Sequence, residues 1–135
     1  LYGTAVLLSE STFRTIPESH RYNFRLLDRV RVKGKSEPVM LYELLDALPK
    51  ELCARRLKPR DIFQDALYAY WNGEFERAVR AFQKCLDIDP EDKTAILLNE
   101  RANWQARSGA ASKDWTGAFD MNVLLQEESA AKNKS

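Results

Sequence analysis

The spacing of hydrophobic residues changes along this chain from a period of two to a helical period. Residues 24–32 and 39–45 alternate as strands do, whereas from residue 62 onward hydrophobic residues recur three and four positions apart. These two patterns cannot belong to one kind of element. The sequence therefore predicts an α+β fold in which part of a sheet is followed by a group of helices.

The composition is typical of a soluble globular protein. Of the 135 residues, 44% are hydrophobic and 30% are charged, and the net charge of +1 gives no overall attraction to nucleic acid or anionic lipid. No hydrophobic run approaches the roughly 20 residues that cross a bilayer. Cys53 and Cys85 lie far apart, and His20 is the single histidine, so neither a disulfide framework nor a zinc site is predicted. A cytoplasmic setting fits best.

The first 46 residues predict a strand, a short helix and a β-hairpin. Residues 4–9 form a short hydrophobic run, after which Ser9 or Ser11 can cap a helix that Pro17 ends. So small an α+β segment buries too little hydrophobic area to be stable alone. We therefore expect it to complete a sheet whose other strands precede residue 1.

The predicted hairpin has a glycine in its turn and basic residues along one strand. Gly34 can adopt the positive φ that the turn "KGKSEP" requires, and the alternation of the first strand breaks at Leu27-Asp28, where we expect a bulge or bend. The odd positions predict a basic outer face, made of Arg25, Arg29 and Arg31. Aromatic residues are not interleaved with them as in single-strand binders, so no nucleic-acid partner is predicted.

The remaining chain divides into a linker, a helical module and a tail. Residues 47–60 carry two prolines and a basic cluster and are interpreted as the linker. Residues 61–108 predict two antiparallel helices broken at Asn72-Gly73, then a third helix capped near Asp92 and ended by Gly109. Residues 109–135 form the tail. Trp104 and Trp115 are expected to be packing anchors.

The stretch "GEFERAVRAFQKCLDIDP" resembles the second half of a tetratricopeptide repeat, a helix-turn-helix unit of about 34 residues. The residues that match the packing positions of the repeat are Gly73, Phe75, Ala78, Phe82, Cys85 and Pro90. The third helix would cap this single repeat. Two interpretations stay open, a groove that binds a protein partner and a helical support for the neighbouring sheet, of which the support is favoured.

The stretches "YGTAVLLSEST" and "RLLDRVRVKGKSEPVMLYELL" resemble the C-terminal end of a class III adenylate or guanylate cyclase catalytic domain. The resemblance covers residues 1–46. Some bacterial members carry a tetratricopeptide-like segment and a "DW-x-G" tail after this domain, and here "DWTG" occupies residues 114–117. The chain is therefore similar to the C-terminal part of a bacterial-type homodimeric cyclase with a helical extension.

The resemblance implies a specific chemistry. The family converts ATP or GTP into the cyclic 3',5'-monophosphate and pyrophosphate, with two Mg or Mn ions held by two aspartates at sites shared in a dimer. At the start of the turn a lysine reaches the nucleotide phosphates, and that position is Lys33. On the residues alone a solvated lysine is the competing interpretation, and it is retained for Lys35.

The other functional residues of the family lie upstream of this chain. The metal-binding aspartates and the residues that serve the transition state have no counterpart here, so the chain alone is expected to be inactive and to bind no metal. Asp28 is expected to pair with a neighbouring arginine rather than with a metal. The choice between ATP and GTP, and any membrane anchor of the parent protein, are also decided upstream. The alternative function is a scaffold that binds peptides through the helical module.

Overall fold

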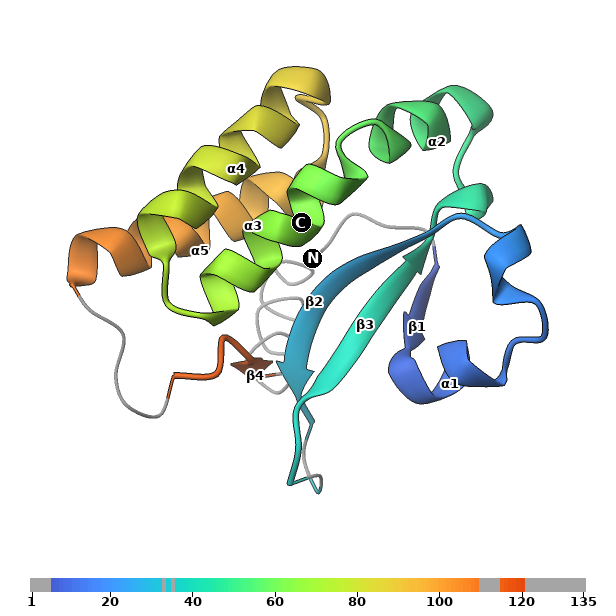
Figure 1. Ribbon diagram of the computed structural model, residues 1–135, viewed down its shortest axis with the longest axis horizontal. Coiled ribbons are helices and arrows are strands. Elements are labelled where there is room, and N and C mark those ends of the chain that lie inside the picture. The colour runs from blue at the N-terminus through green and yellow to red at the C-terminus, as the bar shows by residue number, and fades with distance from the viewer. Residues whose placement is uncertain (1–5, 33, 35, 110–114, 121–135) are drawn as a thin grey trace, which may run out of the picture.

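The computed structural model describes residues 6–32, 34, 36–109 and 115–120, and it has the predicted α+β architecture (Figure 1). A small sheet lies beside a group of helices. The strands are β1 (Leu7–Ser9), β2 (Phe24–Arg31), β3 (Val39–Leu44) and β4 (Phe119–Asp120). The helices are α1 (Glu10–Thr15), α2 (Lys50–Leu57), α3 (Arg60–Trp71), α4 (Phe75–Ile88) and α5 (Lys93–Ser108), with 3₁₀ turns at Ser19–Arg21 and Leu45–Ala47.

The sheet has the strand order β1-β3-β2-β4. β3 pairs antiparallel with both β1 and β2, and the two-residue β4 pairs parallel with β2. The predicted bulge is confirmed, because the register of β2 against β3 shifts between Leu26 and Asp28. The strand β4 was not predicted from the sequence.

The short helix α1 forms where its capping signal predicts it. Ser9 is the N-cap, and its side chain accepts a hydrogen bond of 3.3 Å from the backbone N–H of Thr12. Phe13 of this helix stacks on Tyr42 of β3 with 4.4 Å between ring centroids and meets Phe24 edge to face. These aromatic contacts hold α1 against the hairpin.

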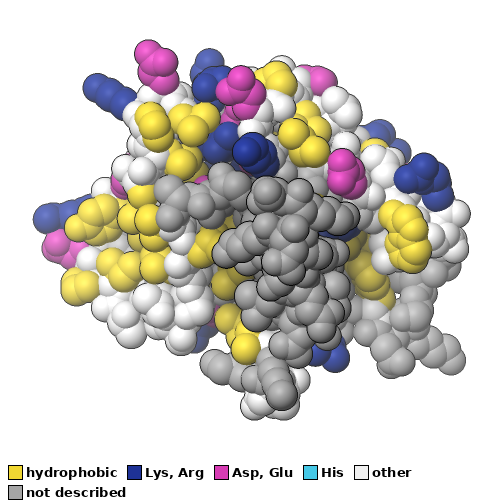
Figure 2. Space-filling view, turned by 180° about the vertical axis from the view of Figure 1, so that it is seen from behind, with side chains coloured by type: hydrophobic (Ala, Val, Ile, Leu, Met, Phe, Trp, Pro, Cys, Tyr) yellow, Lys and Arg dark blue, Asp and Glu magenta, His cyan; other side chains and the backbone are white. Residues whose placement is uncertain are grey.

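Exposed hydrophobic residues lie on the edge strand β1 and just before β2. Leu7 of this edge strand is 42% exposed, and Tyr22, which precedes β2, is 51% exposed. Figure 2 shows hydrophobic side chains gathered on the side of the molecule where β1 and α1 lie. At Leu7 the edge strand β1 is therefore not covered by the residues that the structure describes.

The prediction of a basic outer face on β2 is wrong for Arg25, which is only 1% exposed. Arg29 is half-buried, and Arg31 is exposed as predicted. The cause is the position of the helices, since α3 lies against β2 and the start of α5 supplies a carboxylate to Arg25. Alternation in a strand shows which residues share a face, but it does not show whether other elements cover the polar face.

The helices α3, α4 and α5 begin and end near the predicted positions. Gly73 has φ +80° between α3 and α4. Asp92 caps α5 by accepting a hydrogen bond from the backbone N–H of Ala95, and Gly109, with φ +105°, ends that helix. Trp104 is 60% exposed, so the prediction that it anchors packing is wrong, because it lies on the solvent side of α5.

One hydrophobic cluster runs from the helices into the sheet. It contains buried residues of α3, α4 and α5 together with Leu26 of β2, and Met40 and Tyr42 of β3 pack against it. The segment interpreted as a linker contains α2, whose Arg56 is buried. The division into domains stays a prediction, but the two parts share a core. Among the described residues no helix has the length and hydrophobicity to cross a membrane.

Phe82→Ala should destabilise the chain by about 3–5 kcal/mol, because it leaves a cavity in a close-packed core. Phe82 is fully buried and meets Phe63 edge to face at 5.7 Å. Urea unfolding followed by circular dichroism measures the loss. Ile88→Ala, on the same helix but 41% exposed, is the control and should cost less than about 1 kcal/mol. Equal losses for the two variants would contradict the packing described here.

Candidate functional site

The tip of the β2–β3 hairpin is where the sequence places its candidate phosphate ligand. Gly34 has φ +85° in the turn, and a Cβ built on it would have nothing within 4 Å. Lys33 and Lys35 lie outside the described residues. The structure therefore places the turn, and the role of Lys33 stays a prediction.

A shallow hollow of about 400 Å³ lies beside this turn. Residues of α1 and of the turn line it, namely Glu10, Ser11, Gly34, Ser36, Glu37, Pro38 and Val39. The carboxylate of Glu10 is paired with Arg14 at 2.6 Å, which offsets its charge. Phosphate binding here would still need cations from the turn itself.

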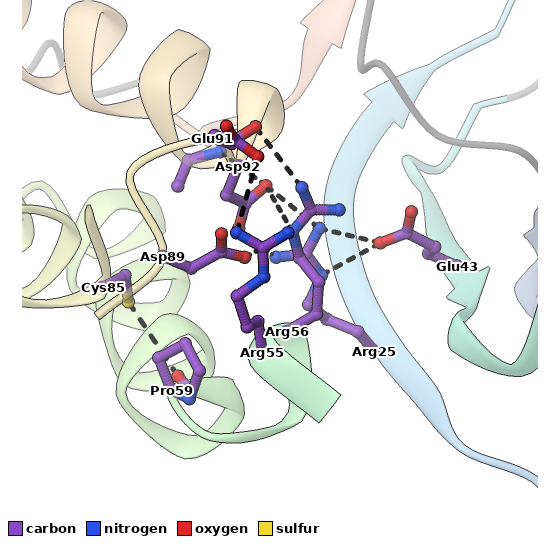
Figure 3. A network of polar contacts seen from close by, with 10 residues as sticks. Arg25, Glu43, Arg55, Arg56, Pro59, Cys85, Asp89, Glu91 and Asp92 are labelled. Atoms are coloured by element: carbon purple, nitrogen blue, oxygen red, sulfur yellow. Dashed lines mark hydrogen bonds and ion pairs between the residues drawn. The ribbon is translucent and has the colours of Figure 1, made fainter. Parts of the chain in front are cut away.

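The base of the hairpin contains a buried group of charges that we call the ion cluster (Figure 3). Its members are Arg25 of β2, Glu43 of β3, Arg56 of α2, and Asp89 and Asp92 from the turn between α4 and α5. Each of these side chains is at least nine-tenths buried. The cluster thus joins the sheet to two parts of the helical segment, α2 and the turn between α4 and α5.

Arg25 makes four hydrogen bonds in this cluster. Its Nε and Nη2 donate to Oε1 of Glu43 at 3.1 and 2.7 Å, and its Nη1 and Nη2 donate to Oδ2 and Oδ1 of Asp92 at 2.6 and 3.3 Å. The guanidinium also lies 4.4 Å from the ring centroid of Phe63. Burial opposes the charge of Arg25, but the carboxylates of Asp92 and Glu43 outweigh it, and the pKa of Arg25 is raised above its ordinary value.

Arg56 completes the cluster from α2. Its Nε donates to Oδ2 of Asp89 at 2.6 Å and lies 3.8 Å from Oδ1 of Asp92. The cluster therefore holds two arginines and three carboxylates. Oε2 of Glu43 and Oδ1 of Asp89 are buried without a hydrogen-bond partner among the described residues. With negative charge in excess, both arginines are needed to keep the carboxylates buried.

A second group of contacts, which we call the distal contacts, holds β2 nearer the turn. Asp28 pairs with Arg101 of α5 at 3.1 Å, so its partner is an arginine, as predicted, but one that lies 73 positions along the chain rather than a neighbour. The guanidinium of Arg29 lies 4.4 Å from the ring centroid of Trp71 in α3, and its Nη1 donates to the carbonyl oxygen of Thr116 at 2.7 Å. The hairpin strand is thus fixed at two points along its length.

The segment "WTG" (residues 115–117) packs against the end of α3. The indole N–H of Trp115 donates to the carbonyl oxygen of Tyr70 at 3.0 Å, and its ring meets Tyr70 and Phe75 edge to face. The backbone of Gly117 lies directly against Trp71. Trp115 is thus a packing anchor, as predicted, whereas Asp114 lies outside the described residues.

The residues matched to the tetratricopeptide pattern lie in and around the α3–α4 hairpin. Phe75, Ala78, Phe82 and Cys85 are buried, Gly73 is half-buried, and Pro90 is exposed. Burial raises the pKa of the Cys85 thiol to about 12, so this cysteine is not a nucleophile at neutral pH. The positions fit helix packing, and the identity of the repeat stays a prediction.

The described residues contain no group of three His, Cys, Asp or Glu side chains placed to hold a metal ion. The three carboxylates of the ion cluster are instead occupied with Arg25 and Arg56. Sequence reasoning missed this cluster entirely. The one available signal was the acidic turn "DIDPED" (residues 87–92), whose two buried aspartates need cationic partners.

The chain is similar to a segment of an adenylate cyclase. It is 32% identical over 101 residues to a protein of Dictyostelium discoideum described as adenylate cyclase, terminal-differentiation specific. The match covers 74% of this chain and about 5% of the length of that protein. Neither a family model nor a solved structure matches the chain.

The length of the match fixes part of its location. A stretch covering 74% of 135 residues is about 100 residues long, so it must include residues 36–100 wherever it begins. That range contains β3, α2, α3, α4 and the start of α5. The similarity to the cyclase therefore extends from the hairpin into the helices.

Gly117→Ala should detach the "WTG" segment from α3. A Cβ at this position, where φ is +74°, would overlap the indole of Trp71 and lie 2.9 Å from its Cα. We expect a local loss of about 2–3 kcal/mol. Hydrogen exchange of the Trp115 indole N–H, measured by NMR, should accelerate at least about tenfold.

Gly109→Ala is the control for this variant. Gly109 also has a positive φ, of +105°, but nothing lies within 4 Å of a Cβ there. This variant should leave the exchange of the Trp115 indole N–H nearly unchanged. The same protection in both alanine variants would show that Gly117 does not hold the segment.

Proposed function

We propose that this chain is the C-terminal portion of a nucleotidyl cyclase, which makes cyclic 3',5'-nucleotide and pyrophosphate from ATP or GTP for intracellular signalling. The observation that carries the proposal is the similarity to the Dictyostelium adenylate cyclase. Because this similarity includes residues 36–100, it supports hairpin and helices as parts of one protein. The observed order of strand, short helix and hairpin agrees with the resemblance of residues 1–46 to the end of a class III catalytic domain.

The open side of the sheet supports a larger catalytic domain. β1 is an edge strand with an exposed hydrophobic residue, Leu7. Such an edge can pair with a further strand. In this proposal the remaining strands of the catalytic sheet join here, and a bacterial-type homodimer forms through that domain in the cytoplasm, with or without an upstream membrane anchor.

In the proposed reaction this chain contributes to nucleotide binding rather than to bond formation. Lys33 would bind the triphosphate from the hairpin tip, where Gly34 leaves the approach open. The two Mg or Mn ions would neutralise the triphosphate and activate the attacking 3'-oxygen. No group of metal ligands lies among the described residues, so no metal-dependent step is assigned to them. The chain alone is proposed to be inactive.

The contacts of α3 favour a supporting helical module over a peptide-binding scaffold. Phe63 and Trp71 of α3 are covered by Arg25 and Arg29 of the sheet. The side of α3 that faces β2 is therefore occupied by this chain's own residues. A protein partner would have to use another surface of the helices.

The role of Lys33 can be tested in a protein that includes the whole catalytic domain. Cyclase activity is measured with ATP and with GTP, in Mn²⁺, for the unaltered enzyme and for Lys33→Ala. We expect Lys33→Ala to raise the KM for the nucleotide about tenfold, because a charge-assisted contact to phosphate is lost. The maximal rate should change less.

Lys35→Ala is the matched control, since Lys35 occupies the same turn and is expected to be solvated. It should stay within about twofold of the unaltered enzyme. No activity with either nucleotide in a folded dimer would refute the proposed function. Activity that Lys33→Ala leaves unchanged would keep the enzyme and refute the role of Lys33.

A further inference from the structure

The helices hold the β2–β3 hairpin at two levels. At its base, Arg25 of β2 is bonded to Glu43 of β3 and to Asp92 at the start of α5. Nearer the turn, Asp28 and Arg29 make the distal contacts with α5, α3 and Thr116. Both levels lie on β2, the strand that leads into the turn at Gly34.

Arg25 links the position of β2 to the first turn of α5. Asp92 accepts from Arg25 and also from the backbone N–H of Ala95, which begins the helix. A movement of β2 away from Asp92 would leave a buried guanidinium with half of its partners, which is costly in a site that excludes water. The strand and the helix start are therefore expected to move together.

Removal of Arg25 would also leave the carboxylates of Glu43 and Asp92 buried and underpaired. Arg56 is bonded to Asp89 and lies 3.8 Å from Asp92, so it cannot replace the hydrogen bonds that Arg25 makes. The repulsion and desolvation of these acids would favour opening of the space between sheet and helices. Among the residues that the structure describes, Arg25 is the side chain that joins the two acids directly.

We infer that α2–α5 position the hairpin for nucleotide binding, and that Arg25 is the positioning residue through which they act. The inference rests on the proposed function. Arg25 is buried at the base of the hairpin and acts through β2 rather than by touching the nucleotide. We call the contacts of Arg25 with Glu43 and Asp92 the joint. The similarity to the cyclase includes both partners of Arg25, since residues 36–100 contain the positions of Glu43 and Asp92.

Coupling of this kind is reciprocal. If the helices stabilise the nucleotide-binding position of the hairpin, nucleotide bound at its tip must stabilise the joint by the same free energy. The first turn of α5 should then become better protected when nucleotide binds, although the tip and Asp92 are at opposite ends of β2. A helical segment that only covers the sheet would not show this response.

The test uses the enzyme with its whole catalytic domain and this chain. The variants are Arg25→Met and Asp92→Asn, and the second keeps an oxygen that can cap α5 if the first fails to fold. Arg21→Met is the control, because the Arg21 side chain is 66% exposed and pairs with nearby Glu18. Amide hydrogen exchange is measured at residues 24–31, 39–44 and 93–98, with and without a non-hydrolysable ATP analogue. KM and kcat are measured alongside.

We expect both variants of the joint to accelerate exchange in the hairpin at least about tenfold, as local opening becomes easier. The KM for the nucleotide should rise about fivefold to tenfold while kcat falls less than about threefold, because binding geometry is lost and the reacting groups are intact. The ATP analogue should slow exchange at residues 93–98 in the unaltered enzyme and in Arg21→Met, but not in Arg25→Met.

Two results would overturn the inference. In the first, amide exchange in Arg25→Met and Asp92→Asn accelerates at the start of α5, whereas exchange in the hairpin is unchanged. In the second, the protein is destabilised throughout but KM stays constant, which assigns Arg25 a structural role alone. An enzyme inactive with both nucleotides would refute the proposed function, and exchange in the hairpin of Arg25→Met would then decide by itself whether helices and hairpin are coupled.

Discussion

The burial of Arg25 is the constraint on which the arrangement of sheet and helices depends. A guanidinium taken out of water needs carboxylates in good geometry, and its two partners come from different parts of the chain, Glu43 from the paired strand and Asp92 from the start of α5. The sheet alone would leave Arg25 half-satisfied, and the helices alone would leave Asp92 buried beside too little positive charge. The cluster is complete only when both parts are in place, so it specifies their relative position in a way that hydrophobic contact alone would not.

Local signals in the sequence were sufficient for most of the element boundaries. Ser9 and Asp92 cap their helices, Gly109 ends α5, and the bulge occurs where the alternation breaks near Asp28. Each of these features depends on the residue and its neighbours within one turn or one strand pair, so short-range patterns are informative. The change of hydrophobic period likewise separates strands from helices without any knowledge of the tertiary structure.

The candidate site could be predicted only in part, because its contacts join residues far apart in the sequence. Nothing within β2 indicates that Arg25 has a carboxylate partner 67 positions away, and a basic alternating strand is more often solvated on that face. The prediction for Trp104 was wrong in the opposite sense, since this aromatic residue was expected to be packed but is 60% exposed. Its burial would have needed a neighbouring element on that side of α5. In both cases the missing information was which faces of the elements meet.

The geometry of the hairpin determines how a group at its tip can be held in place. No neighbouring atom lies within 4 Å of a Cβ built on Gly34, so nothing packs against this position of the turn. The strand that leads into the turn is held firmly, since β2 is fixed at Arg25 and again at Asp28 and Arg29. A strand held at two points along its length can translate and tilt far less than one held at its base alone. The helices thus restrict the movement of β2, which is a physical reason for one chain to keep sheet and helices together.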